Sequence, residues 1–142
     1  MNGNAELLNF IYQNSQMGID TIGQLIDITE EQEFREFLKK QKADYEEFHE
    51  KARNMLNENG FDEKGISLFE KIKAYLMINF QTLTDKSTGH IAEMLIIGSN
   101  MGVTDAIKNI NKYKEAEKDI VKLMEKLKVH EEKSIENLKK FL

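Results

Sequence analysis

The stretch TEEQEFREFLKKQKADYEEFHEKARNMLNENG (residues 29–60) decides the fold class, because its inward side chains recur in unbroken steps of four and three. Such steps place side chains on one face of an α-helix. Thr29 followed by Glu-Glu-Gln at 30–32 is typical of a capping box, so we expect the helix to begin there. Asn59 and Gly60 are expected to end it, since glycine tolerates a left-handed C-cap. The inward residues form one stripe along the helix, which consists of Phe34, Leu38, Gln41, Tyr45, Phe48, Ala52 and Met55.

The composition indicates one helical domain and excludes several function classes. The 142 residues include no proline, cysteine or tryptophan. The absence of proline permits long helices, and the absence of cysteine excludes disulfides, cysteine zinc sites and thiolate nucleophiles. The net charge of −5, with mixed signs, argues against nucleic-acid binding. The start MNGNAELLNF lacks signal-peptide features and no apolar run approaches about 18 residues, so we expect a cytoplasmic protein without membrane association.

Four further segments carry a helical apolar pattern: residues 4–28, 67–83, a segment from near Asp85, and one from about Lys114 to the C-terminus. No segment alternates with a period of two for long, so the predicted fold class is all-α. The expected inward residues of the first segment are Leu8, Ile11, Tyr12, Ser15, Gly18, Ile19, Ile22 and Ile26. Those of the segment near Asp85 are Ala92, Leu95, Ile96, Ser99, Gly102, Val103, Ala106 and Ile110. Those of the last are Ala116, Ile120, Leu123, Leu127, Glu131, Ser134, Leu138 and Phe141.

An internal repeat indicates how the segments pair. The sequence NSQMGI (residues 14–19) aligns with GSNMGV (residues 98–103), at an offset of 84 residues. The repeat predicts two helical hairpins, about 4–59 and 85–142, within a single domain of residues 1–142. A crossover helix at about 67–83 would cover roughly 25 Å and carry the chain along the bundle. A four-helix bundle with one long crossover is the ferritin-like arrangement.

The chain resembles the ferritin-like, rubrerythrin-like superfamily in this pattern of helices. One specific motif is present, Glu46-x-x-His49, which is half of the family's di-metal signature. The ending EEKSIENL (residues 131–138) is similar to the family's last helix. Members of the family bind iron or manganese and carry out redox or peroxide chemistry. The resemblance implies inward carboxylates from two helices and Glu-x-x-His from the other two.

Helical-wheel geometry argues against an intact metal site. Glu46 lies roughly 120° and His49 roughly 65° from the centre of their stripe, which predicts a solvent-facing glutamate and a boundary histidine. Glu131 is inward, but Ser134 stands where the family has histidine, and the side chain of His130 diverges from that of Glu131. Carboxylates on the other two helices fall off the stripes. We therefore expect no metal or other cofactor, with Glu46, His49, His130 and Glu131 as remnants of a lost site.

A polar layer is predicted where related bundles keep metal. Ser15, Gln41, Tyr45, Ser99 and Glu131 should lie at one level, and we expect them to form a hydrogen-bonded network. A buried carboxylate needs such partners or stays protonated. The alternative is that the helices splay there and water satisfies each group separately.

Two further patterns concern packing. The motif Gly98-x-x-x-Gly102 predicts that the crossover helix or a neighbouring helix of the bundle comes close to the helix that carries these two glycines. Five apolar residues lie opposite the core stripes of two helices, and this surplus predicts a homodimer interface. These residues are Phe10, Met17, Met94, Ile97 and Met101.

The sequence favours a non-enzymatic helical bundle with a structural or protein-interaction role and a protein partner that it does not identify. Residues 58–65 lack the order of a phosphate-binding loop, and no serine has a histidine and an acid in convincing order, so no catalytic residue is assigned. The alternative is a metal-binding redox protein that uses iron or manganese in a shifted geometry.

Overall fold

The computed structural model describes residues 2–63, 75–76 and 84–142. These residues form four long helices and no strand, so the all-α fold class is confirmed for the described chain. The helices are α1 (Asn4–Ile28), α2 (Gln32–Glu58), α4 (Thr88–Lys112) and α5 (Lys118–Leu138), followed by a short 3-10 helix, η1 (Lys139–Phe141).

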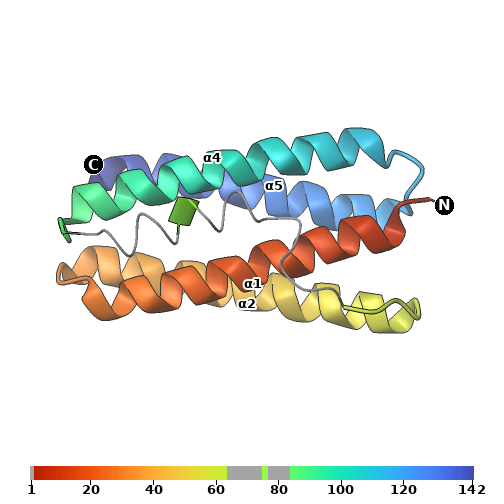
Figure 1. Ribbon diagram of the computed structural model, residues 1–142, viewed down its shortest axis with the longest axis horizontal. Helices are drawn as coiled ribbons and strands as arrows, with labels where there is room; N and C mark the ends of the chain where they lie inside the picture. The colour runs from red at the N-terminus through yellow and green to blue at the C-terminus, as the bar shows by residue number, and fades with distance from the viewer. Residues whose placement is uncertain (1, 64–74, 77–83) are drawn as a thin grey trace.

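The helices pair as two antiparallel hairpins, α1 with α2 and α4 with α5 (Figure 1). The end of α2 and the beginning of α4 lie at opposite ends of the bundle, so these two helices run in the same direction (Figure 1). The predicted crossover helix at 67–83 lies outside the described residues except for Tyr75 and Leu76, which are helical. The backbone N–H of Glu117, before α5, donates to Asn4 Oδ1 at 2.9 Å and joins the two hairpins at one end.

The end of α2 follows the sequence prediction. Gly60 has a positive φ of 71°. The N–H of Phe61 donates to the carbonyl of Leu56 at 2.9 Å, and that of Gly60 to Asn57 at 3.1 Å. These two bonds form a Schellman cap, which uses glycine because the left-handed conformation is costly for residues with a Cβ.

The predicted start of α2 is wrong. Thr29 is the C-cap of α1, and its hydroxyl donates to the carbonyl of Leu25 at 2.7 Å. Helix α2 begins at Gln32 after Glu31, whose side chain makes no capping bond.

The last two helices begin three to four residues later than expected. Ser87 caps α4 by accepting from the N–H of His90, and residues 113–117 connect α4 to α5.

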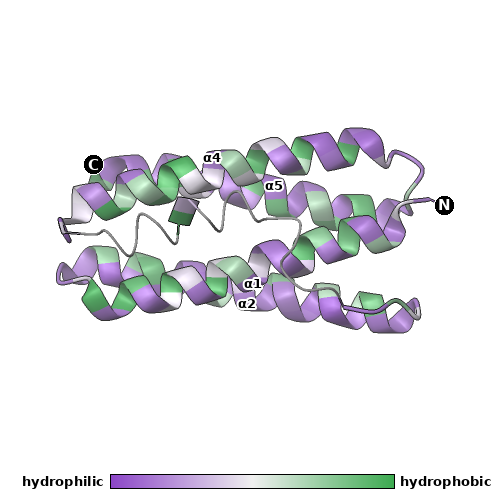
Figure 2. Cartoon of the chain, viewed as in Figure 1, coloured by the Kyte–Doolittle hydropathy of each residue, from purple (hydrophilic) through white to green (hydrophobic). Residues whose placement is uncertain are grey.

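The core lies between the two hairpins. All eight residues predicted to face inward on the last segment are buried, seven on α5 and η1 and Ala116 in the connection before α5. Most of those on α2 are buried as well. On α1 the buried surface is wider than the predicted stripe and includes Leu7, Phe10, Asn14 and Leu25. Hydrophobic and hydrophilic segments alternate along the helices, as expected for helices that bury one side (Figure 2).

Close approach at the glycine pair is confirmed. A Cβ on Gly98 would lie 3.1 Å from Cδ2 of Leu76, which belongs to the segment predicted as the crossover. A Cβ on Gly102 would lie 2.8 Å from Oε2 of Glu131. The two glycines therefore make room for different neighbours, one apolar and one acidic.

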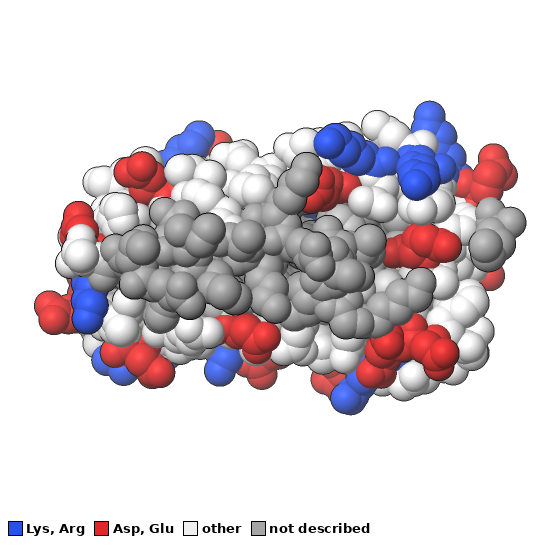
Figure 3. All heavy atoms as spheres, viewed as in Figure 1, with Lys and Arg blue, Asp and Glu red and all other residues white. Residues whose placement is uncertain are grey.

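The apolar surplus is smaller than the sequence suggested. Phe10 is 1% exposed and Met94 3% exposed, so the chain itself buries both side chains. Met17 and Met101 are half-buried, and Ile97 is exposed. Acidic and basic side chains are interspersed around the edge of the face shown in Figure 3, and the largest basic group lies near the turn between α4 and α5.

Candidate functional site

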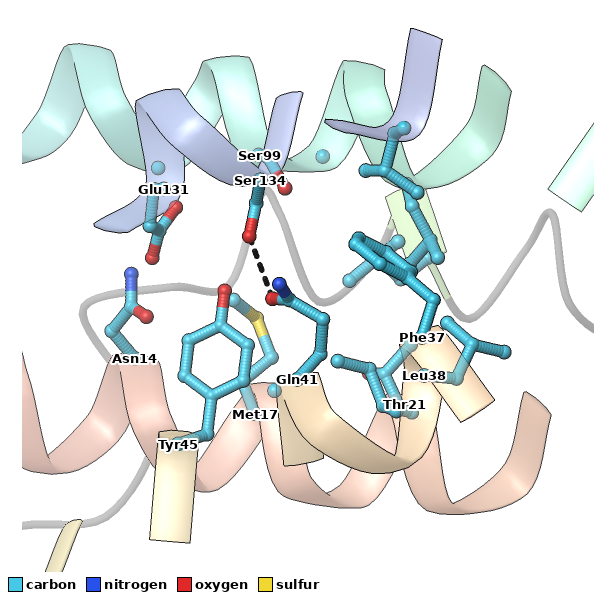
Figure 4. Close-up of a pocket in the computed structure, with 17 residues that line it drawn as sticks. Asn14, Met17, Thr21, Phe37, Leu38, Gln41, Tyr45, Ser99, Glu131 and Ser134 are labelled. Atoms are coloured by element: carbon cyan, nitrogen blue, oxygen red, sulfur yellow. Dashed lines mark hydrogen bonds between the residues drawn. The ribbon is translucent and has the colours of Figure 1, made fainter. Parts of the chain in front are cut away.

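Five polar side chains meet in the buried interior between the hairpins, and we call this group the polar centre (Figure 4). Helix α1 supplies one of them, α2 two and α5 two. They are Asn14, Gln41, Tyr45, Glu131 and Ser134.

Glu131 is the acidic member of the polar centre and is only 4% exposed. Its carboxyl group is hydrogen-bonded to the side chains of Asn14 and Tyr45, which come from the other hairpin. Burial raises the pKa of Glu131 to about 7, because the loss of hydration outweighs the two hydrogen bonds that favour the charged form. The group can therefore exist as neutral acid or as carboxylate near neutral pH.

Tyr45 remains a hydrogen-bond donor to this carboxyl group. Burial raises the pKa of its phenol well above the usual value of 10, and the charge of Glu131 and their hydrogen bond add to the effect. A Cβ on Gly18 would lie 2.7 Å from Cδ2 of Tyr45. Glycine on α1 thus lets the tyrosine ring come close to the helix backbone, just as Gly102 admits Glu131 to the surface of α4.

A second hydrogen bond crosses the interior beside the first. The hydroxyl of Ser134 on α5 donates to Oε1 of Gln41 on α2 at 2.6 Å. Both side chains are buried, so each satisfies a polar group that would otherwise be costly in the core. The two hairpins are consequently joined by polar contacts at neighbouring levels.

The predicted polar layer is confirmed for three residues and wrong in its choice of serine. Tyr45 and Glu131 are hydrogen-bonded to each other, and Gln41 takes part in the separate bond with Ser134 beside them. Ser15 instead donates to carbonyls of its own helix, those of Ile11 at 2.7 Å and Tyr12 at 3.0 Å. Ser99 lines the adjoining cavity and is half-buried.

Sequence reasoning missed two members of the network. Asn14 directly precedes the serine that was assigned to the layer, and its amide could bond a carboxylate as well. Ser134 was placed inward but interpreted only as a missing histidine. Its position one turn after Glu131 was the available signal, since residues three apart lie on the same helix face.

The four remnant candidates lie in four different environments. Glu46 is exposed, as predicted, and His49 lies at the boundary, where its ring stacks on Tyr12 with centroids 4.4 Å apart. The pKa of His49 is lowered chiefly by burial and secondly by the charge of Arg53. Nε2 of this ring is buried and has no hydrogen-bond partner among the residues that the structure describes.

His130 points away from the polar centre. Its Nε2 lies 3.1 Å from Oδ2 of Asp44 on α2, and its ring contacts Tyr45 and Phe48. Among the described residues, no group of three or more His, Asp or Glu side chains is arranged to hold a metal ion. Glu46, His49, His130 and Glu131 are therefore not brought together into one ligand set.

A cavity adjoins the polar centre between the hairpins. It offers about 50 Å³ to the centres of water-sized molecules. Glu131, Asn14 and Tyr45 lie toward one end, and Phe37, Leu38 and Thr21 toward the other (Figure 4). The interior of the bundle thus provides a small space with one polar and one apolar end.

Comparisons of the chain with protein-family models, curated proteins and solved structures gave no match. The resemblance to the ferritin-like superfamily accordingly stays a prediction from the sequence pattern. Within the described ranges, no helix combines the length and apolar character needed to span a membrane.

Proposed function

We propose that the chain is a non-enzymatic helical bundle with a structural or protein-interaction role, in which a hydrogen-bonded polar centre replaces a di-metal site. The observation that carries the proposal is the contact of Glu131 on one hairpin with Asn14 and Tyr45 on the other. The inward carboxylate serves the chain's own packing. Its two partners fix the level at which the hairpins meet.

The donor chemistry of the polar centre does not fit an iron or manganese pair. A di-metal bundle surrounds its ions with several carboxylates and imidazoles. Here one carboxyl group faces an amide and a phenol that direct hydrogens toward its oxygens. A pair of divalent ions would leave most of its positive charge without balance in a buried site.

Metal content tests this proposal against the redox alternative. The chain is purified anaerobically, loaded with ferrous iron or manganese, and analysed beside Glu131→Gln and His49→Ala. We expect no retained metal in any of the three proteins, and an altered unfolding temperature for Glu131→Gln. About two metal ions per wild-type chain, lost in both variants, would overturn the proposal and favour the redox protein.

We also propose that the protein forms a homodimer through the outer face of α4. Ile97 is 40% exposed there, and Met101 lies one turn further along the same face. Sedimentation analysis should give the mass of a dimer for the wild type and of a monomer for Ile97→Glu. Val129→Glu is the control, because Val129 is an apolar residue of similar exposure, 41%, that lies on α5 and not on α4. A wild-type monomer at all concentrations would exclude self-association.

A further inference from the structure

The cavity beside the polar centre has the properties of a ligand site that the packing role does not use. Its polar end is formed by Glu131 with Asn14 and Tyr45 (Figure 4). Phe37, Leu38 and Thr21 lie toward its other end (Figure 4), and Leu138 from α5 also lines the cavity. Small-molecule sites combine a mostly apolar wall with a few converging polar groups, and this cavity does so at a small scale.

The charge at the polar end is incompletely balanced. Glu131 is the one charged side chain among the described residues that line the cavity. An ionised carboxylate can accept about four hydrogen bonds, whereas the side chains of Asn14 and Tyr45 supply two. Both donors are neutral, so none of the described residues that line the cavity supplies a positive charge to balance the carboxylate. One monovalent cation supplies that charge without the excess that a pair of divalent metal ions brings.

We propose that this cavity binds a short primary alkylamine as its ammonium ion, with the nitrogen beside Glu131 and the alkyl chain against Leu38 and Leu138. The ammonium group donates to the carboxylate oxygens that Asn14 and Tyr45 leave open. The alkyl chain replaces water along the apolar wall, which favours binding in proportion to the area removed from water.

The volume limits the size of the amine. The cavity leaves about 50 Å³ for the centres of water-sized molecules, so it is larger than a site for a single water. Propylammonium is a ligand of correspondingly small size. Gly98 and Gly102 line the cavity, and their lack of side chains leaves this space open.

The site also determines how binding depends on pH. Among the described residues, the groups that face Glu131 are Asn14 from α1, Tyr45 from α2 and the backbone of α4 at Gly102. Asp44 and His130 lie on the outer side of Tyr45 and are paired with each other. Tyr45 keeps its proton over the relevant range, so Glu131 is the group whose ionisation controls amine binding.

Methyl-detected NMR with propylammonium chloride tests the proposal. Wild type, Glu131→Gln and Glu132→Gln are titrated at pH 8.5 and pH 5.5. Glu132→Gln is the matched control. It makes the same chemical change at the neighbouring position, where the side chain is exposed and lies outside the cavity. We expect saturable shifts of Leu38, Leu138 and Met17 methyl groups, with a Kd on the order of millimolar for so small a ligand. The affinity should fall about thirtyfold at pH 5.5, where few Glu131 side chains are ionised.

Each outcome decides the question. Loss of the shifts in Glu131→Gln but not in Glu132→Gln, with the stated pH dependence, supports the ammonium site. Equal binding of 1-propanol, or equal binding by Glu131→Gln, would show an apolar cavity that does not recognise cations. Absence of saturable shifts in the wild type at pH 8.5 would overturn the proposal. The comparison of wild-type binding at pH 8.5 and pH 5.5 still tests it if a variant folds poorly. Metal content is measured separately, so failure here leaves the proposed function unaffected.

Discussion

Tyr45 on α2 donates a hydrogen bond to Glu131 on α5, and this bond joins the two hairpins in the interior of the bundle. Each partner is admitted by a glycine of the internal repeat, Gly18 beside the tyrosine and Gly102 beside the glutamate. The repeated glycine therefore has one physical role in both halves: it brings the backbone of α1 or α4 close to a polar side chain of the paired helix.

The first prediction concerns Gly18→Ala. Alanine favours a helix interior by about 1 kcal/mol over glycine. The new Cβ would lie 2.7 Å from Cδ2 of Tyr45, and such overpacking costs about 1–3 kcal/mol. We expect a net loss of about 1 kcal/mol in the free energy of unfolding, measured by urea denaturation.

Gly23→Ala is the matched control for that substitution. Gly23 lies on the same helix, and its Cβ would be 3.7 Å from Cε of Lys42, an ordinary contact. We expect it to stabilise the protein by about 0.5–1 kcal/mol. Stabilisation by both alanines would show that Tyr45 moves aside at little cost.

The second prediction concerns the Ser134–Gln41 bond. Ser134→Ala leaves Oε1 of Gln41 buried without its donor, which should cost about 1–2 kcal/mol of unfolding free energy. The double variant Ser134→Ala/Gln41→Leu should lose less than the sum of the single losses, because it removes both polar groups. Additive losses in a double-mutant cycle would show that the bond contributes no coupling.

The inward-facing residues of α2 and α5 could be predicted from the sequence because these helices have a sharp division between polar and apolar faces. Every residue assigned inward on α5 is buried, including Glu131, which was identified from the position of the stripe alone. Glu46 was placed in solvent by the same argument, although its Glu-x-x-His motif suggested a ligand.

The stripe of α1 was harder to locate because small and apolar residues surround much of that helix. Its centre was therefore uncertain by about one residue, which assigned Ser15 rather than Asn14 to the network. Phe10 was placed outward and is buried for the same reason. The predicted N-cap at Thr29 was wrong for a different reason. A threonine between two helices can hydrogen-bond to the end of either helix, and tertiary packing decides which one.

The third prediction concerns the C-cap of α2. Gly60 has a φ of 71°, and no neighbouring group of the described chain lies within 4 Å of the position a Cβ would take. Gly60→Ala should therefore cost about 1 kcal/mol through backbone strain alone. Gly60→Asn should cost less, because asparagine adopts the left-handed conformation more readily. Thermal unfolding of both variants checks this order, and equal losses would contradict it.

The fourth prediction follows from the ionisation of Glu131. Its pKa is about 7 in the folded protein and 4.5 in an unperturbed chain, so the folded state binds the proton more tightly. Stability from this group is fully present below about pH 4.5 and is lost as pH rises through 7. The maximum loss is roughly 3 kcal/mol, since each pKa unit corresponds to about 1.4 kcal/mol.

Glu131→Gln removes this titration and should flatten the pH dependence of stability. At pH 5 the wild type should be the more stable protein, because its neutral carboxyl group keeps both hydrogen bonds at no cost in charge. By pH 8 that advantage should shrink by roughly 2–3 kcal/mol, because only the wild type then holds a buried charge. Urea denaturation at several pH values between 5 and 8 measures the difference in unfolding free energy between wild type and Glu131→Gln. The other titrating groups are the same in both proteins, so their contributions cancel. Glu132→Gln should instead follow the wild type, because Glu132 is exposed. A constant difference between wild type and Glu131→Gln would mean that Glu131 titrates near its ordinary pKa in the folded protein.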